Sequence, residues 1–205
     1  MEKKPTAGII LAAGTSSRLG RPKQLLEING RMLLAKTVDT TLASQLDHVI
    51  LVLGHESGRI IAALGERLKD PRISVTINER YRDGMSGSLQ QGLLQAGGSF
   101  PSIMVILGDQ PFLDHGTIDL LLAKFRDSDK DICVPCLKGR HGLPVILSSR
   151  FYKDIMSIRG DVGARNIVRE NPECVLRVEI ENVDCFFDID SEEDLQRWAF
   201  QDLIP

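Results

Sequence analysis

The sequence has few aromatic residues, no excess of positive charge and no long apolar run. Phenylalanine, tryptophan and tyrosine make up 5% of its 205 residues, which is too few for the stacking platforms that bind single-stranded nucleic acids. The net charge of −3 gives no basis for nucleic-acid binding. No stretch approaches a membrane span, and the apolar run at residues 7–13 is too short for a signal sequence with its cleavage site. We therefore expect a cytoplasmic protein that binds neither nucleic acid nor membrane.

Cysteine is also scarce, with residues at positions 133, 136, 174 and 185 only. Cys133 and Cys136 have the Cys-x-x-Cys spacing of zinc sites and redox dithiols. No second pair and no nearby pair of histidines accompanies them, and the segment around them has the apolar character of a strand. The pattern favours two core cysteines over a metal or redox site and leaves their role open.

Two common phosphate-binding motifs are absent after the first apolar run. A Walker A loop has four residues between its glycines, followed by Lys and Ser or Thr, whereas five residues separate Gly14 from Gly20 and Arg-Pro follows. The dinucleotide fingerprint Gly-x-Gly-x-x-Gly is missing because Ala12 stands two residues before Gly14. Pro22 disfavours helical geometry at Arg21, so we expect an extended loop rather than a helix-capping phosphate loop.

The segment at residues 14–23 is instead strongly cationic. It contains Arg18, Arg21 and Lys23, and it contains no acidic residue. Such a loop would attract a polyanion, and its backbone amides could donate to phosphate oxygens. The alternative is a surface turn whose basic side chains are only solvated.

Apolar runs alternate with helix-like segments over the first two thirds of the chain. The runs lack polar alternation, which is typical of strands covered on both faces in a parallel sheet. We expect strands at 7–13, 48–53, 73–77 and 102–107 and helices near 32–44, 57–69, 86–97 and 115–126. This alternation predicts a doubly wound α/β fold with a mostly parallel sheet. The length predicts a single domain over residues 1–205.

The last third of the chain has a different pattern. Residues 131–147 form two apolar runs around a short polar segment, which predicts a hairpin-like excursion. Pro144 confines the second run to an edge or irregular strand. We expect helices near 148–157 and 161–171, a strand pair near 174–180 and 185–189, and a final helix from 191.

An isolated carboxylate follows the predicted strand at 102–107. Asp109 comes just after that strand and a glycine, and ligands of open α/β sheets bind beyond the carboxyl ends of the strands. Mg²⁺ binds through one or two protein carboxylates together with substrate phosphates, so Asp109 is a candidate metal ligand. The alternative is that Asp109 caps the turn before Pro111.

A second acidic segment lies near the C-terminus. Asp188 and Asp190 are two residues apart on the predicted strand, so they are expected to project to the same face. Ser191 and Asp194 predict a capping box for the final helix. Asp190, at the strand exit, is the better candidate to complete a metal site with Asp109.

A third polar segment connects the strand at 73–77 to the next helix. Asp83-Gly84 marks a turn, and Ser88 with Gln91 predicts a capping box that opens the helix. Small residues around a helix start leave room for a ligand and offer free amides. The alternative is an ordinary helix entry.

Together these segments resemble one known family. Leu11-Ala-Ala-Gly14-x-Ser16-x-Arg18-x-Gly20-x-Pro22-Lys23 is similar to the signature of the molybdenum cofactor cytidylyltransferases, which are MobA-like NTP transferases. The similarity continues in order through Asn78, Gly84–Ser88, Leu107–Pro111, Gly160–Arg165 and Asp188–Leu195. Any one block is weak evidence, but the ordered set spans nearly the whole chain.

The resemblance implies a Rossmann-like fold of the nucleotide-diphospho-sugar transferase type. It implies that Lys23, Arg18 and Asp109 are catalytic and that Asp109 and Asp190 hold Mg²⁺. The nucleotide-binding residues that it implies are Leu11, Ala12, Ala13, Gly14, Lys23, Asn78, Gly84, Ser86 and Ser88.

The resemblance also implies the substrates. Guanylyl-transferring relatives carry Gly and Asp where this chain has Ala13 and Pro22, which is similar to the cytidylyl-transferring branch. It therefore implies CTP as the nucleotide, a molybdopterin-type acceptor and, because some relatives serve purine degradation, xanthine dehydrogenase as a partner. Family members often carry Gly-His-Pro or Gly-Asn-Pro where this chain has Gly142-Leu143-Pro144, so an acceptor contact by that polar residue is not carried over.

The reaction implied by the resemblance is attack of an acceptor phosphate on the α-phosphate of CTP with release of pyrophosphate. A phosphate monoester is already anionic near neutral pH, so positioning and charge stabilisation suffice without a protein base. Two alternatives stay open: a non-catalytic carrier of the finished cofactor, and a nucleotidyltransferase that acts on a sugar or alditol phosphate.

Overall fold

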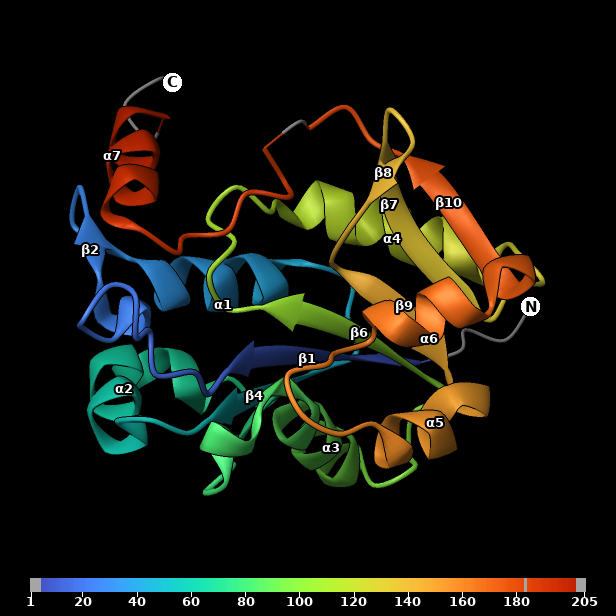
Figure 1. The fold of residues 1–205 in the computed structure, drawn as a ribbon, viewed down its shortest axis with the longest axis horizontal. Coiled ribbons are helices and arrows are strands. Elements are labelled where there is room, and N and C mark those ends of the chain that lie inside the picture. The colour runs from blue at the N-terminus through green and yellow to red at the C-terminus, as the bar shows by residue number, and fades with distance from the viewer. Residues whose placement is uncertain (1–4, 183, 202–205) are drawn as a thin grey trace.

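The computed structural model describes residues 5–182 and 184–201 and has a central sheet with helices on both faces (Figure 1). In the described residues the large sheet has eight strands in the order β10-β7-β9-β6-β1-β4-β5, with β8 paired to β7. These strands are β1 (Thr6–Ala12), β4 (His48–Leu53), β5 (Ile73–Ile77), β6 (Ser102–Leu107), β7 (Ile132–Leu137), β8 (Arg140–His141), β9 (Val145–Ser148) and β10 (Val175–Glu179). A small second sheet pairs β2 (Glu27–Ile28) with β3 (Arg31–Met32).

Strand β1 lies at the middle of the parallel part of the sheet. It pairs in parallel with β4 and β6, so that Leu11 is level with Val52 on one side and Leu107 on the other. Strand β5 continues the parallel part beyond β4, whereas β9 runs antiparallel to both β6 and β7. The predicted α/β fold with a mostly parallel sheet is confirmed. The carboxyl ends of β6, β1, β4 and β5 therefore meet at one edge.

Helices cover the two faces of the sheet. They are α1 (Leu33–Ala43), α2 (Ser57–Leu64), α3 (Met85–Ala96), α4 (His115–Arg126), α5 (Tyr152–Ser157) and α6 (Arg165–Glu170), and a further helix, α7 (Glu192–Gln201), lies apart from them. Side chains of β1 alternate between two buried clusters: Ile10 packs with residues of α1, α2 and α4, and Ile9 packs with residues of α3, α5 and α6. Continuous apolar strands are thus explained by burial on both sides.

Helix α7 packs away from the two main faces, beside β2 (Figure 1). Its Leu195 and Trp198 are buried with Leu26, Leu33 and Ile189. The predicted capping box at its start is confirmed: Ser191 Oγ accepts from Asp194 N at 3.2 Å, and an Asp194 carboxylate oxygen accepts from Ser191 N at 2.8 Å. This packing holds the C-terminal segment against the chain that follows the cationic loop.

Several predicted boundaries are wrong. The helix expected at 57–69 ends at Leu64 and continues as a 3₁₀ turn over Gly65–Lys69. The helices expected at 148–157 and 161–171 are the shorter α5 and α6, and a 3₁₀ turn over Ser149–Phe151 precedes α5. The strand expected at 185–189 is irregular chain, because Cys185 N and Phe187 N donate to carbonyls three residues earlier rather than to a neighbouring strand.

The proline expected to mark an edge strand lies next to an interior one. Strand β9 begins at Val145, directly after Pro144, and runs between β6 and β7. Because Pro144 precedes the paired residues, its missing N–H removes no ladder hydrogen bond. The expected position of the second run is therefore wrong. The predicted hairpin-like excursion over 131–147 is confirmed, because the two apolar runs form β7 and β9, which pair antiparallel, and β8 in the polar segment between them pairs back on β7.

Cys133 and Cys136 both lie on β7, as the strand pattern predicts. They are three residues apart, so their side chains point to opposite faces of the sheet. Burial raises the pKa of Cys133 to about 12, which disfavours the thiolate that metal binding and disulfide exchange require. No helix of the described residues is long and apolar enough to cross a membrane.

Candidate active site

The cationic loop leaves β1 at Ala12 and ends at a 3₁₀ turn over Lys23–Leu25. Gln24, only 3% exposed, donates its amide to Ala12 O at 3.0 Å and to Gly14 O at 2.9 Å. Ser16 Oγ accepts from Lys23 N at 3.0 Å. These bonds fold the loop back on itself and deliver Lys23 to the edge of the sheet. The predicted extended loop is present, but the buried role of Gln24 had no signal in the sequence.

Lys23 lies at the centre of a charged cluster. Its ammonium group donates to the Asp109 carboxylate, to Asp190 Oδ1 at 2.9 Å and to Ile189 O at 3.0 Å. Arg18 reaches Asp190 Oδ2 at 2.8 Å from the other side. The structure thus brings together all four residues predicted to be catalytic or to hold a metal, although they come from the loop, the end of β6 and the segment before α7.

Burial governs the protonation of this cluster. Burial would lower the pKa of Lys23, but the charge of Asp109 and hydrogen bonds to both carboxylates outweigh it and raise that pKa. Burial raises the pKa of Asp109, and the Lys23 charge opposes the rise. Burial and the charge of Asp109 raise the pKa of Asp188 from about 3.8 to about 7. The site therefore concentrates more carboxylates than its single buried cation compensates.

The carboxylates fit a divalent cation. Asp109 Oδ1 and Asp188 Oδ1 are buried without a hydrogen-bond partner, and oxygen atoms of this kind are ligands that Mg²⁺ prefers. Asp188 and Asp190 were expected on one face of a strand, but they lie on irregular chain fixed by the bond from Ile189 N to Asp109 O at 3.1 Å. In the described part of the chain no three acidic, histidine or cysteine side chains form a complete metal site. Lys23 bridges Asp109 and Asp190 instead.

Replacing Asp188 by asparagine should stabilise the metal-free protein increasingly as the pH rises. The folded pKa near 7 lies above the unfolded value, so the wild type loses stability between about pH 4 and pH 7 as the buried carboxyl ionises. We expect the gain of Asp188→Asn to grow by about 1 kcal/mol between pH 5 and pH 8, less than the full shift because Asp188 is partly exposed. Urea unfolding with EDTA measures it. The control is Glu170→Gln, which changes an exposed acid of α6 and should alter the free energy of unfolding by nearly the same amount at every pH. A difference for Asp188→Asn that is equally independent of pH would contradict the prediction.

The remaining predicted residues lie on the other side of β1. Asn78, after β5, donates through Nδ2 to Ser88 Oγ at 3.1 Å and accepts at Oδ1 from Arg80 N at 3.0 Å. Ser86 and Ser88 are buried in the first turns of α3. The predicted capping box of Ser88 and Gln91 is wrong, because α3 already begins at Met85 and Gln91 donates to Thr76 Oγ1 at 2.9 Å.

Gly84 starts α3 in a conformation that requires glycine. Its φ is +106°, and a Cβ built on it would lie 2.3 Å from the carbonyl carbon of Gly160. Ser86 N donates to Gly160 O at 3.2 Å. Asn78, Ser86 and Gly160 also line a cavity of about 650 Å³ beside α3. Gly160 and Asp161, called the 160 segment below, thus cover the first turn of α3.

Leu11, Ala12, Ala13 and Gly14 connect the two halves of the site. Leu11 O accepts from Gly108 N at 3.0 Å, and Ala13 O accepts from His55 N at 3.2 Å. Leu11, Ala12 and Ala13 are buried, whereas Gly14 is exposed and a Cβ on it would meet nothing within 4 Å. Backbone at the end of β1 thus separates the Lys23 cluster from the Asn78 segment.

Comparison with known proteins supplies the family. The model of the MobA-like NTP transferase domain matches residues 8–175. A probable molybdenum cofactor guanylyltransferase of Thermococcus sibiricus is 26% identical over 93% of this chain and 95% of its own length. Nicotine blue oxidoreductase of Paenarthrobacter nicotinovorans is 29% identical over 93% of this chain and 94% of its length. Purine catabolism protein PucB of Bacillus subtilis is 28% identical over 79% of this chain and 80% of its length.

Solved structures agree on the fold. Rv0371c of Mycobacterium tuberculosis, in a complex with manganese, matches with a TM-score of 0.80 over 96% of this chain and 98% of that chain, at 24% identity. The fold is that of the α/β nucleotidyltransferases. Since the family match spans most of the chain, the protein belongs to the MobA-like NTP transferase domain family and is a nucleotidyltransferase.

Proposed function

We propose that this enzyme transfers CMP from CTP to the phosphate of the molybdenum cofactor, with release of pyrophosphate and with Mg²⁺ as the metal. The observation that carries the proposal is the meeting of Lys23 with Asp109 and Asp190 beneath a cationic loop. A metal-bound triphosphate needs cations for its oxygens and carboxylates for its metal, and this cluster offers both.

Each residue has a proposed task. Lys23 and Arg18 bind the triphosphate, and the backbone of the Leu11–Gly14 segment lies against the nucleotide together with Asn78, Gly84, Ser86 and Ser88. Asp109 and Asp190 would hold Mg²⁺, which when bound supplies positive charge to the phosphate oxygens. The acceptor phosphate is already anionic near neutral pH, so the chain's residues act by orienting the reactants and stabilising charge.

The choice of CTP rests on Ala13 and Pro22, which resemble the cytidylyl-transferring branch. The name of the Thermococcus relative favours GTP instead, so GTP is the second candidate. The name of PucB supports a place in purine breakdown. Within that proposal the loaded cofactor serves a molybdenum hydroxylase such as xanthine dehydrogenase.

Turnover with each of the four nucleoside triphosphates tests the proposal. With a molybdopterin-type acceptor and Mg²⁺, we expect pyrophosphate release with CTP at a kcat/KM on the order of tenfold or more above that with GTP. A preference for GTP would assign the guanylyl reaction.

The acceptor is tested in the same assay. Sugar and alditol phosphates should give no release above background, and release with these acceptors alone would contradict the assigned acceptor. Absence of release with every acceptor would support a non-catalytic cofactor carrier.

A further inference from the structure

Each of the three cations of the loop pairs with a carboxylate near the start of α7, and two of them share Asp190. Arg18 pairs with Asp190 at 2.8 Å and Arg21 with Glu192 at 3.1 Å. Lys23 pairs with Asp190 at 2.9 Å and with Asp109. The groups suited to a polyanion and the groups suited to a metal therefore occupy each other's binding positions.

These pairs differ in how deeply their side chains are buried and therefore in how much free energy it costs to separate them. The side chains of Lys23 and Asp109 are 17% and 14% exposed, whereas those of Arg18 and Arg21 are 77% and 53% exposed. Exposed pairs contribute little because solvent screens them. Separating Lys23 from Asp109 instead leaves an uncompensated buried charge, which is strongly unfavourable. The Lys23 pair thus dominates the energetics of opening the site.

We propose that Lys23 is an internal counterion at the metal position, so that metal and nucleotide each bind tightly only when the other is present. This inference rests on the proposed function. A nucleotide alone must draw Lys23 from Asp109 and leave that carboxylate unpaired. A metal alone must approach a position already held by an ammonium group. With both bound, Lys23 would place its charge against the phosphates and Asp109 and Asp190 would hold the metal, so that these three side chains each keep a partner of opposite charge.

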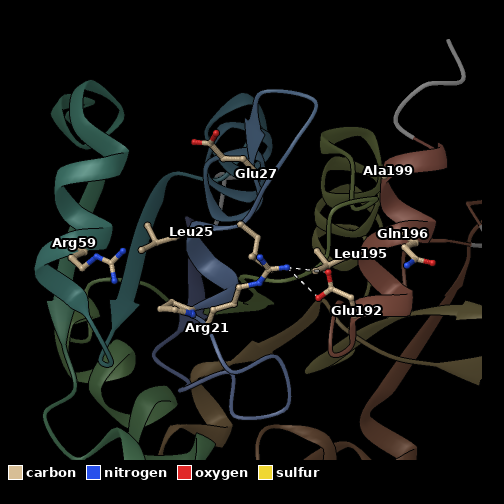
Figure 2. A pocket seen from close by; sticks show the side chains of 10 residues that line it. Arg21, Leu25, Glu27, Arg59, Glu192, Leu195, Gln196 and Ala199 are labelled. Atoms are coloured by element: carbon tan, nitrogen blue, oxygen red, sulfur yellow. Dashed lines mark hydrogen bonds and ion pairs between the residues drawn. The ribbon is translucent and has the colours of Figure 1, made fainter.

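The acidic segment is also held in place by contacts that do not involve Lys23. The capping box of Ser191 and Asp194 fixes the start of α7, and buried Leu195 and Trp198 anchor the helix. Figure 2 shows Arg21 reaching across to Glu192, with dashed lines to its carboxylate. This pair lies at a cavity of about 490 Å³ between α2 and α7. Since these contacts hold the backbone around Asp190, opening the pair requires the long side chain of Lys23 to move.

Arg21 offers a matched control for Lys23. Both are cations of the same loop and both pair with the segment before and within the first turn of α7. Arg21 contacts Glu192, which is outside the predicted metal ligands, whereas Lys23 contacts Asp109 and Asp190. Removing either one changes the net charge equally, but only Lys23 vacates the metal position.

Binding of Mn²⁺ and CTP, measured separately and together, tests the proposal. Electron paramagnetic resonance of free Mn²⁺ gives metal affinity, and calorimetry gives CTP affinity. In the wild type each ligand should strengthen binding of the other by about 5–150-fold. Lys23→Gln should strengthen binding of Mn²⁺ alone on the order of tenfold, because the repulsion at the metal position is gone. The factor by which CTP and Mn²⁺ strengthen each other's binding should fall towards one. Arg21→Gln should leave binding of Mn²⁺ alone nearly unchanged.

The outcomes separate this inference from the proposed function. Equal gains in Mn²⁺ affinity for Lys23→Gln and Arg21→Gln would overturn the counterion role, because the loss of one positive charge anywhere in the loop would then explain the gain. No gain for Lys23→Gln would also overturn it, because Lys23 would then not compete with the metal. Tight CTP binding to the wild type in EDTA would also overturn it. Failure of the wild type to bind any nucleoside triphosphate with Mn²⁺ present would contradict the proposed function and the coupling together. Lys23→Met, checked by circular dichroism, replaces Lys23→Gln if that variant does not fold.

Discussion

Asp109→Ala should lower turnover with CTP and Mg²⁺ by on the order of 10²–10³-fold, as loss of a comparable electrostatic group does. Asp109 follows β6 at the carboxyl edge of the sheet, its side chain is 14% exposed, and it pairs with Lys23. Its loss would remove a proposed metal ligand and the buried partner of Lys23 at once. Steady-state pyrophosphate release, with the fold checked by circular dichroism, measures the effect.

The control for Asp109 is another acid of the same region. Glu193→Gln removes an exposed carboxylate in the first turn of α7 and should keep nearly full turnover. Asp109→Asn should behave as Asp109→Ala does, since it keeps the shape but not the charge. Full turnover of the Asp109 variants would show that the proposed metal site is wrong.

Gly84→Ala should destabilise the protein by about 3 kcal/mol or more. A side chain is disfavoured at φ +106°, and its Cβ would overlap the backbone of Gly160 and Asp161. Backbone atoms cannot rotate away as a side chain can, so the 160 segment must shift. For a protein of this size the thermal midpoint should fall by about 6–12 °C.

Gly58→Ala is the matched control for Gly84→Ala. Gly58 lies in α2, and a Cβ on it would meet nothing within 4 Å. Alanine there should be neutral or stabilising by about 0.5 kcal/mol. Differential scanning calorimetry of both variants is the measurement, and similar midpoints for the two would mean that Gly84 and Gly160 are not in tight contact.

The sequence predicts best what depends on local pattern. The apolar runs that became β1, β4 and β6 are buried on both faces, so their continuous character is a direct consequence of the fold. Asp109 could be predicted because a residue that directly follows a parallel strand lies where open α/β sheets bind their ligands, and the strand itself is visible in the sequence. The capping box at Ser191 was found for the same reason.

The errors arise where contacts distant in sequence decide the structure. The start of α3 is set by Gly84 against Gly160, which overrides the Ser88 pattern. Asp190 was chosen on the premise of a strand, yet the segment is irregular and is positioned by Asp109. The pairing of Lys23 with residues 86 and 167 positions away has no local signature.

The buried anchor of α7 gives the protein an internal optical probe. Trp198 is the only tryptophan of the chain and is 0% exposed. It shares its cluster with Leu26, which follows the loop, and with Ile189, which lies between the two acidic residues. Its fluorescence therefore reports on a single region, the contact between the chain that follows the loop and the C-terminal segment, here called the seam. Any ligand that rearranges this seam changes the surroundings of the chain's single indole, so fluorescence can follow its binding without an attached dye.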